Sequence, residues 1–127
     1  MLELRRSIFI YNTMNGTYVR EESIDGFNFY HKQSVQIKNK LYTVDWDTLS
    51  VVRFTFCRPS KDSSCFKNLV QKKSLASLKR QRKWISAVAD STCQAIFITG
   101  GWTQSFNGGR NHQNVDKYDI KNDKWYP

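Results

Sequence analysis

The chain has 127 residues, of which 14% are aromatic, and its formal net charge is +9. This length suits a single domain, and the aromatic content is unlike that of a disordered tail. No apolar run approaches the roughly 18 residues of a membrane-spanning helix, and the apolar run after Arg5 and Arg6 is too short for a signal peptide. We therefore expect a cytoplasmic protein.

Most of the sequence has the pattern of short strands joined by tight turns. Asn15-Gly16 favours a two-residue hairpin because both turn positions need a positive φ, and Lys38-Asn39-Lys40 marks a second hairpin. Nothing before residue 58 has the length and period of a helix. The expected strands occupy residues 7–12, 16–21, 34–37, 40–46, 50–56, 84–89, 95–101, 114–120 and 124–127.

The strand pattern repeats along the chain. Residues 11–18 and 118–125 both place an aromatic residue, a turn and a second aromatic residue at the same spacing. Residues 34–44 also match residues 86–99, with Tyr42 aligned to Phe97. These matches give a period of about 50 residues, each holding about four strands, as in repeat architectures.

The clearest copy covers residues 84–127, where Gly100 and Gly101 are followed by Tyr118 and Trp125. This combination resembles the kelch repeat, a four-stranded propeller blade of about 50 residues. The resemblance implies an all-β fold of kelch-like β-propeller blades, each a four-stranded antiparallel sheet. Gly100, Gly101, Tyr118 and Trp125 would be its structural motif.

The resemblance also divides the rest of the chain. Within one partial propeller over residues 1–127, residues 7–21 would form half of an earlier blade and residues 31–70 a degenerate blade. In that blade Val44-Asp45 would stand in place of the glycines and Phe66 in place of the tryptophan. Residues 71–83 would be a basic linker before the blade at 84–127.

This count of about two and a half blades leaves the ring incomplete, because propellers have about 4 to 8 blades. Three explanations stay open. The chain could be part of a larger propeller, a diverged or truncated product, or a segment that completes a ring with its own copies or a partner.

Gly100-Gly101 could in principle hold a phosphate. A phosphate loop, however, needs a lysine and a serine or threonine after its glycines, followed by a helix, whereas Trp102 follows here. We therefore expect the glycines to shape the backbone where a Cβ would not fit.

The segment after Gly101 is a candidate partner-binding loop. It carries Trp102, Phe106, Arg110 and His112, and tryptophan and arginine are enriched at binding hot spots. The alternative is that Trp102 packs on a neighbouring blade while the rest is a solvated loop.

A second candidate is the basic segment 58–83, which contains nine cations and one anion. Its apolar residues have a rough helical spacing (Phe66, Leu69, Val70, Leu75 and Leu78), so a basic amphipathic helix is one interpretation. A nuclear import tract and a solvated inter-blade linker are the others. The candidate patch residues are Lys72, Lys73, Lys79, Arg80, Arg82 and Lys83.

The sequence contains no clear catalytic or metal-binding motif. Three irregularly spaced cysteines and two histidines give neither a disulfide framework nor a zinc spacing. We expect no catalytic residues, metal or cofactor. The first hypothesis is a non-enzymatic scaffold that binds protein partners through its inter-strand loops. The alternative is an electrostatic binder of nucleic acid or anionic membrane through residues 58–83.

Overall fold

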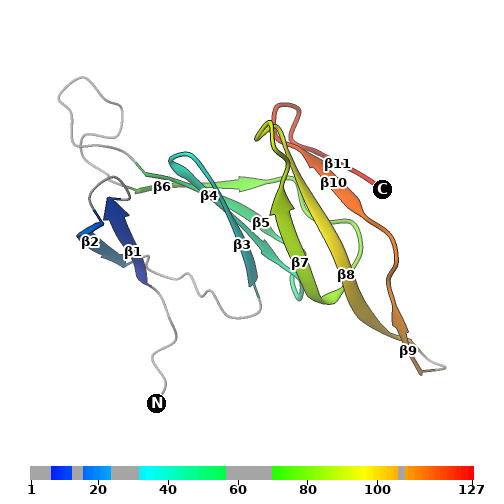
Figure 1. Ribbon diagram of the computed structural model, residues 1–127. Helices are drawn as coiled ribbons and strands as arrows, with labels where there is room; N and C mark the ends of the chain where they lie inside the picture. Colours follow the sequence, from blue (N-terminus) through cyan, green and yellow to red (C-terminus); the bar gives the residue numbers. More distant parts are fainter. Residues whose placement is uncertain (1–6, 13–15, 24–31, 57–69, 106–107) are drawn as a thin grey trace, which may run out of the picture. The chain divides into compact units, whose positions relative to one another are not determined.

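The computed structural model describes residues 7–12, 16–23, 32–56, 70–105 and 108–127 (Figure 1). These residues form eleven β-strands and no helix, so none of them belongs to a helix that could cross a membrane. The chain divides into two compact units, residues 1–30 and 31–127. The all-β fold expected from the sequence is therefore confirmed.

The first unit contains one antiparallel hairpin. Strand β1 (Ser7–Asn12) pairs with β2 (Thr17–Ser23), and the register shifts between Ile10 and Tyr11. Gly16 has a φ of 68°, which glycine adopts without steric cost. The strands thus lie where the sequence predicts them, while Asn15 is outside the described residues.

The second unit begins with a four-stranded antiparallel sheet, which we call the 32–75 sheet. Its strands follow one another in the order β3 (Lys32–Ile37), β4 (Lys40–Asp45), β5 (Val51–Phe56) and β6 (Val70–Leu75). Lys38, with a φ of 53°, and Asn39 form the tight turn between β3 and β4. The hairpin predicted at this position is present.

The remaining strands form what we call the 83–126 sheet. Its order is β11 (Lys124–Tyr126), β10 (Asp116–Asp119), β8 (Ala95–Ser105) and β7 (Lys83–Ala89), all antiparallel. Strand β9 (Gly108–Asn111) pairs only with the end of β8 among the described strands. Figure 1 shows this β8–β9 hairpin extending beyond the other strands of the sheet.

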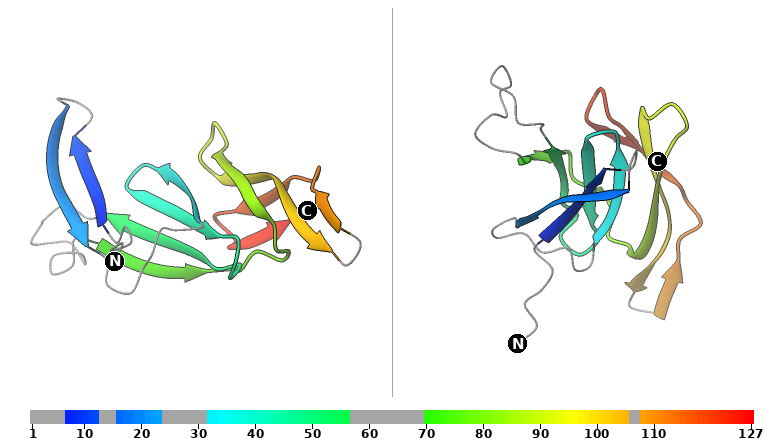
Figure 2. Two further views of the ribbon diagram at one scale, coloured as in Figure 1. Left: turned by 90° about the horizontal axis from the view of Figure 1, so that it is seen from below. Right: turned by 60° about the vertical axis from the view of Figure 1, so that its left-hand side comes forward.

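The two sheets of the second unit pack face to face and share one apolar core (Figure 2). Alternate side chains of a strand point to opposite faces, so each sheet contributes one face to the contact. The 32–75 sheet contributes Val35, Ile37, Tyr42, Val44 and Val51, and the 83–126 sheet contributes Ile85, Ile96, Ile98, Tyr118 and Trp125.

Hydrogen bonds from the linker between the sheets reinforce this packing. The amide of Ala76 donates to Asp123 Oδ1 at 2.8 Å, and its carbonyl accepts from the Trp125 indole at 2.9 Å. The amide of Leu78 donates to the carbonyl of Leu49 at 2.8 Å. The linker is thus bonded to both sheets.

The predicted boundary of the basic linker is wrong. Residues 71–75 belong to strand β6, whose Leu75 lies opposite Val51 and whose Lys72 lies opposite Phe54. Lys72, Lys73 and Ser74 are exposed, as an edge strand tolerates, and they supply the pairing that β5 would otherwise lack. The sheet that begins at Lys32 therefore continues to residue 75, beyond the predicted end at residue 70, and β7 already begins at Lys83. Phe66 lies outside the described residues.

At Val44-Asp45, where the resemblance expects glycines, a side chain organises the turn instead. Val44 is buried, and the Asp45 carboxylate accepts hydrogen bonds from the amides of Asp47 at 2.9 Å and Thr48 at 3.2 Å. It also pairs with Lys32 at 3.2 Å. Burial alone would raise the pKa of Asp45, but these bonds lower it below its usual value. The charged carboxylate holds this turn.

Candidate functional site

Gly101 lets Arg82 and the start of β7 approach strand β8 closely. Gly100 has a φ of 68° and Gly101 a φ of 100°, both in the region that favours glycine. A Cβ on Gly101 would lie 2.7 Å from the Cβ of Arg82 and 3.2 Å from the carbonyl oxygen of Lys83. A Cβ on Gly100 would meet nothing within 4 Å. This geometry supports a backbone role for Gly101.

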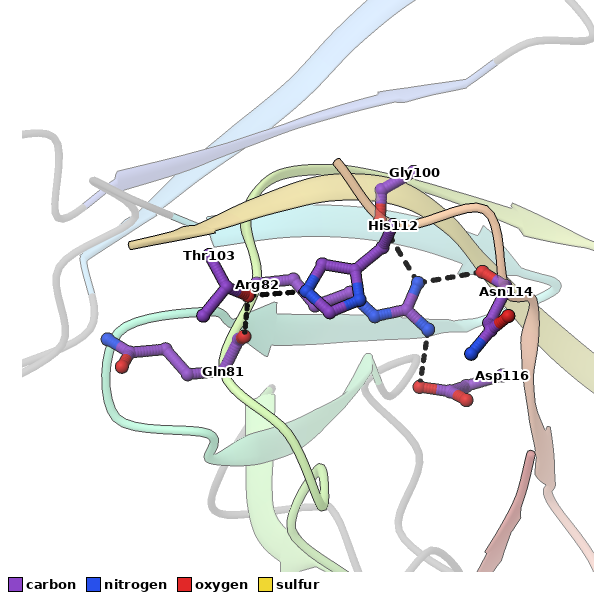
Figure 3. Close-up of polar contacts among 7 residues, drawn as sticks. All are labelled: Gln81, Arg82, Gly100, Thr103, His112, Asn114 and Asp116. Atoms are coloured by element: carbon purple, nitrogen blue, oxygen red, sulfur yellow. Dashed lines mark hydrogen bonds and ion pairs between the residues drawn. The ribbon is translucent and has the colours of Figure 1, made fainter. Parts of the chain in front are cut away.

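Arg82 is buried at this close approach. Its side chain is buried, and its Nη1 donates to the carbonyl oxygens of Gly100 at 3.0 Å and Asn114 at 2.9 Å. Its Nη2 pairs with Asp116 Oδ2 at 2.8 Å (Figure 3). The planar guanidinium matches these three oxygens, and the carboxylate balances its charge. The expectation that Arg82 belongs to an exposed basic patch is therefore wrong.

His112 is held beside this cluster. Its backbone amide donates to the Gly101 carbonyl at 2.9 Å, and its Nε2 is hydrogen-bonded to Thr103 Oγ1 (Figure 3). The single hydroxyl hydrogen of Thr103 is donated to the carbonyl of Gln81 at 2.8 Å, so His112 Nε2 must be the donor to Thr103. Burial and the neighbouring charge of Arg82 lower the pKa of His112. The imidazole is thus a structural donor near neutral pH.

A pocket of about 210 Å³ adjoins the cluster. Its lining includes three cationic residues, Lys79, Arg80 and Arg82, and three apolar or aromatic residues, Leu78, Trp125 and Tyr126. Lys79 and Arg80 are exposed, whereas Leu78 and Trp125 are buried. The pocket therefore combines positive charge with an apolar wall. Within the described ranges, no group of three or more His, Cys, Asp or Glu residues could hold a metal.

The predicted partner-binding loop is mostly a hairpin. Trp102 lies in β8 opposite Asn111, and exposed Arg110 lies in β9 opposite Thr103. The Trp102 ring packs against Trp84, with centroids 5.8 Å apart, and a Cβ on Gly109 would overlap the same indole. Phe106 lies outside the described residues. The prediction of a loop is thus wrong for residues 102–105 and 108–111, because these residues pair as strands.

The predicted basic patch is not one continuous element. Lys72 and Lys73 lie in β6, Lys79 and Arg80 in the linker, and Lys83 at the start of β7. The amphipathic helix is wrong for residues 70–83, since they are strand, linker and strand. Residues 57–69, including Phe66 and Leu69, lie outside the described part of the chain.

Tyr118 and Trp125 are buried side by side. Their Cα atoms are partners across β10 and β11, and their ring centroids are 5.0 Å apart. The Tyr118 hydroxyl donates to Asp123 Oδ1 at 2.5 Å. Burial, together with this bond, raises the pKa of Tyr118, and the bond lowers the pKa of Asp123. Both aromatic residues thus serve the contact between the two sheets.

The sequence analysis missed a largely apolar row on the other side of the 83–126 sheet. We call this side the outer face. Val88, Phe97, Lys117 and Tyr126 are successive Cα partners across its four strands. Their neighbours Ala89, Ile96, Tyr118 and Trp125 face the core, so this row faces away from it. Val88 is 57% exposed and Tyr126 is 40% exposed. Ile85, Ala87 and Ala89 face the core, so the period of two along β7 places Val88 on the opposite face. An apolar residue at that position is the signal that could have found this row.

No family model matches the chain, and no curated protein matches it. Among solved structures it is similar to the structure of YjhT, with a TM-score of 0.57 and 15% sequence identity. The match covers 76% of this chain and 26% of that one. The chain therefore spans about a quarter of the length of YjhT, and the likeness extends to the all-β fold alone.

Proposed function

We propose that this chain is a kelch-like β-propeller segment that acts as a non-enzymatic protein–protein interaction module. The outer face of the 83–126 sheet carries this proposal. A face with exposed Val88 and Tyr126 beside Phe97 resembles a surface that another protein covers, more than an ordinary solvated surface. The partner would be a protein.

The outer face resembles a sheet face of the second unit that already packs against another sheet. In the 32–75 sheet, Val35, Tyr42 and Arg53 are successive Cα partners, and Val35 and Tyr42 belong to the core shared with the other sheet. On the outer face, Val88, Phe97 and Lys117 repeat the order aliphatic, aromatic, cationic. This repetition supports the packing of another sheet on the outer face.

Three further features support the kelch-like interpretation. The glycine pair lies within β8, the second strand of the path β7-β8-β10-β11, and Tyr118 and Trp125 lie in the third and fourth strands of that path. Two such sheets follow one another along the chain and pack face to face. The exposed ring of Trp84, packed on Trp102, would extend the contact surface toward the β8–β9 hairpin.

The test uses self-association, because an outer face without its partner should pack against copies of the chain. We expect light scattering to show assemblies that grow with protein concentration and persist at high salt. Val88→Lys should dissolve them by placing a second charge on the outer face, next to Phe97. Val115→Lys is the matched control, because Val115 is 46% exposed and lies outside the strands. Equal effects of both variants, or a monomer at every concentration, would contradict the proposal.

Electrostatic binding of nucleic acid or an anionic membrane is the second candidate function. Its support is the exposure of Lys72, Lys73, Lys79 and Arg80, since Arg82 is committed to the interior. Such binding should weaken steeply with rising salt, whereas packing on the outer face should not. A titration with nucleic acid at two salt concentrations separates the two functions.

A further inference from the structure

We propose that the pocket beside Arg82 binds the carboxylate of an acidic peptide, which Lys79 and Arg80 hold while the apolar wall accepts a neighbouring apolar side chain. The inference rests on the proposed function only in that a protein partner would carry the peptide. The pocket and the outer face are different surfaces, although both include Tyr126, and they are tested by different variants.

The first argument is the incomplete hydrogen bonding of Arg82. A guanidinium has five N–H donors, and three of them are bonded, to Gly100, Asn114 and Asp116. Its Nε is buried without a hydrogen-bond partner, although Arg82 lines the pocket and only 1% of the residue is exposed. A buried donor without an acceptor is costly. A carboxylate held by Lys79 and Arg80 in the adjoining pocket would offset part of this cost by placing a negative charge next to the enclosed guanidinium.

The second argument is charge. Asp116 also lines the pocket, but it is paired with Arg82 at 2.8 Å, so these two charges balance each other. Lys79 and Arg80 are exposed and contribute two further positive charges to the lining. An anion entering the pocket would therefore meet a net positive surface, where an ionised acceptor forms the stronger hydrogen bonds.

The third argument is the size and the apolar wall. The volume of about 210 Å³ is below the roughly 300 Å³ at which small-molecule pockets usually begin. It fits one or two amino-acid side chains. Leu78, Trp125 and Tyr126 provide an apolar surface that a hydrated phosphate would not use. A glutamate or aspartate next to an apolar residue matches both halves of the pocket.

The experiment measures the binding of a labelled Glu-Phe-Glu-Phe peptide to the purified chain by fluorescence polarisation, with a Gln-Phe-Gln-Phe peptide as the neutral counterpart. We expect the acidic peptide to bind at least about tenfold more tightly, the difference that one charged hydrogen bond supplies. Lys79→Gln/Arg80→Gln should remove this difference. The control Lys38→Gln/Lys121→Gln removes the same charge from exposed sites that do not line the pocket, and it should bind as the parent does.

Two competitors identify the source of the anion. Benzoate should displace the peptide only at concentrations well above the peptide's own, and inorganic phosphate should displace it less well than benzoate. Tighter binding of benzoate than of the peptide would assign the pocket to a free small carboxylate and would overturn the proposal of a peptide ligand. Equal competition by phosphate, equal binding of both peptides, or equal loss in the control variant would show attraction by charge alone. Circular dichroism checks that each variant keeps its β-structure.

Discussion

Arg82 and Gly101 lie so close that a side chain on one excludes a side chain on the other: a Cβ on Gly101 would stand 2.7 Å from the Cβ of Arg82. Real Cβ atoms do not come this near, so either the strand or the arginine must shift. The buried arginine in turn bonds to Gly100 and Asp116. The glycine, the arginine and the carboxylate therefore form one structural unit.

Gly101→Ala should lower the free energy of unfolding by about 1–3 kcal/mol, because it adds strain at a φ of 100° and a clash with Arg82. Gly100→Ala is the control, since its Cβ would enter open space and only the φ of 68° opposes it. Urea unfolding measures both. Equal losses at the two glycines would mean that the close approach has no energetic role.

Arg82→Met should cost about 3 kcal/mol, because it removes a buried charge partner and leaves two carbonyls and Asp116 without their donor. Arg82→Lys should not restore the stability, since an ammonium cannot reach three oxygens in the planar arrangement of a guanidinium. Thermal unfolding of the three proteins checks this. Full stability of the lysine variant would show that only the charge matters.

Tyr118→Phe should lower the free energy of unfolding by about 1 kcal/mol, because it removes the hydroxyl bond to Asp123 but keeps the ring against Trp125. Tyr118→Ala should cost about 3–5 kcal/mol by opening a cavity in the core. Urea unfolding gives both values. A phenylalanine variant as unstable as the alanine variant would contradict this division between hydrogen bond and packing.

Acid should destabilise the contact between the sheets through Asp123. The hydrogen bond from Tyr118 holds the pKa of Asp123 below its ordinary value of 3.8, so the carboxylate stabilises the fold above that pH. This contribution is lost as the pH falls through the lowered pKa. Asp123→Asn should therefore flatten the fall of the melting temperature below a pH of about 4. Tyr118→Phe should flatten this fall of the melting temperature similarly. An unchanged pH dependence in both variants would show that the bond between Tyr118 and Asp123 does not cause the acid destabilisation.

Gly109→Ala should move the Trp102 indole, because the new Cβ would occupy the position of its ring. We expect the contact between Trp102 and Trp84 to change and the tryptophan fluorescence to shift, with little loss of global stability at an exposed hairpin. Trp84→Phe identifies which part of the shift comes from this pair. An unchanged spectrum would place the indole elsewhere in solution.

The features that local sequence determines were predictable. The turn at Lys38-Asn39, strands β7, β10 and β11 and the first part of β8 follow from turn residues and from β-branched and aromatic enrichment. Strand β6 was assigned to the linker because its exposed Lys72 and Lys73 look like solvated residues. Their place in a sheet depends on partners in β5, far away in the sequence.

The burial of Arg82 could not be derived from local pattern. Its acceptors Gly100, Asn114 and Asp116 follow it by 18, 32 and 34 residues, so no short window contains them. In composition Arg82 is one cation among many between Arg58 and Lys83. The pocket was missed for the same reason, because it joins the linker to β11.

The hydrogen bonds of Ala76 couple the two sheets of the second unit during unfolding. Its amide and its carbonyl are both bonded to the turn and strand around β11, at Asp123 and Trp125, while β6 ends just before it. Separating the sheets would expose the core and leave both backbone groups of Ala76 without partners. The sheets should therefore unfold as one cooperative unit, and amide hydrogens in β4 and β8 should exchange with the same opening free energy.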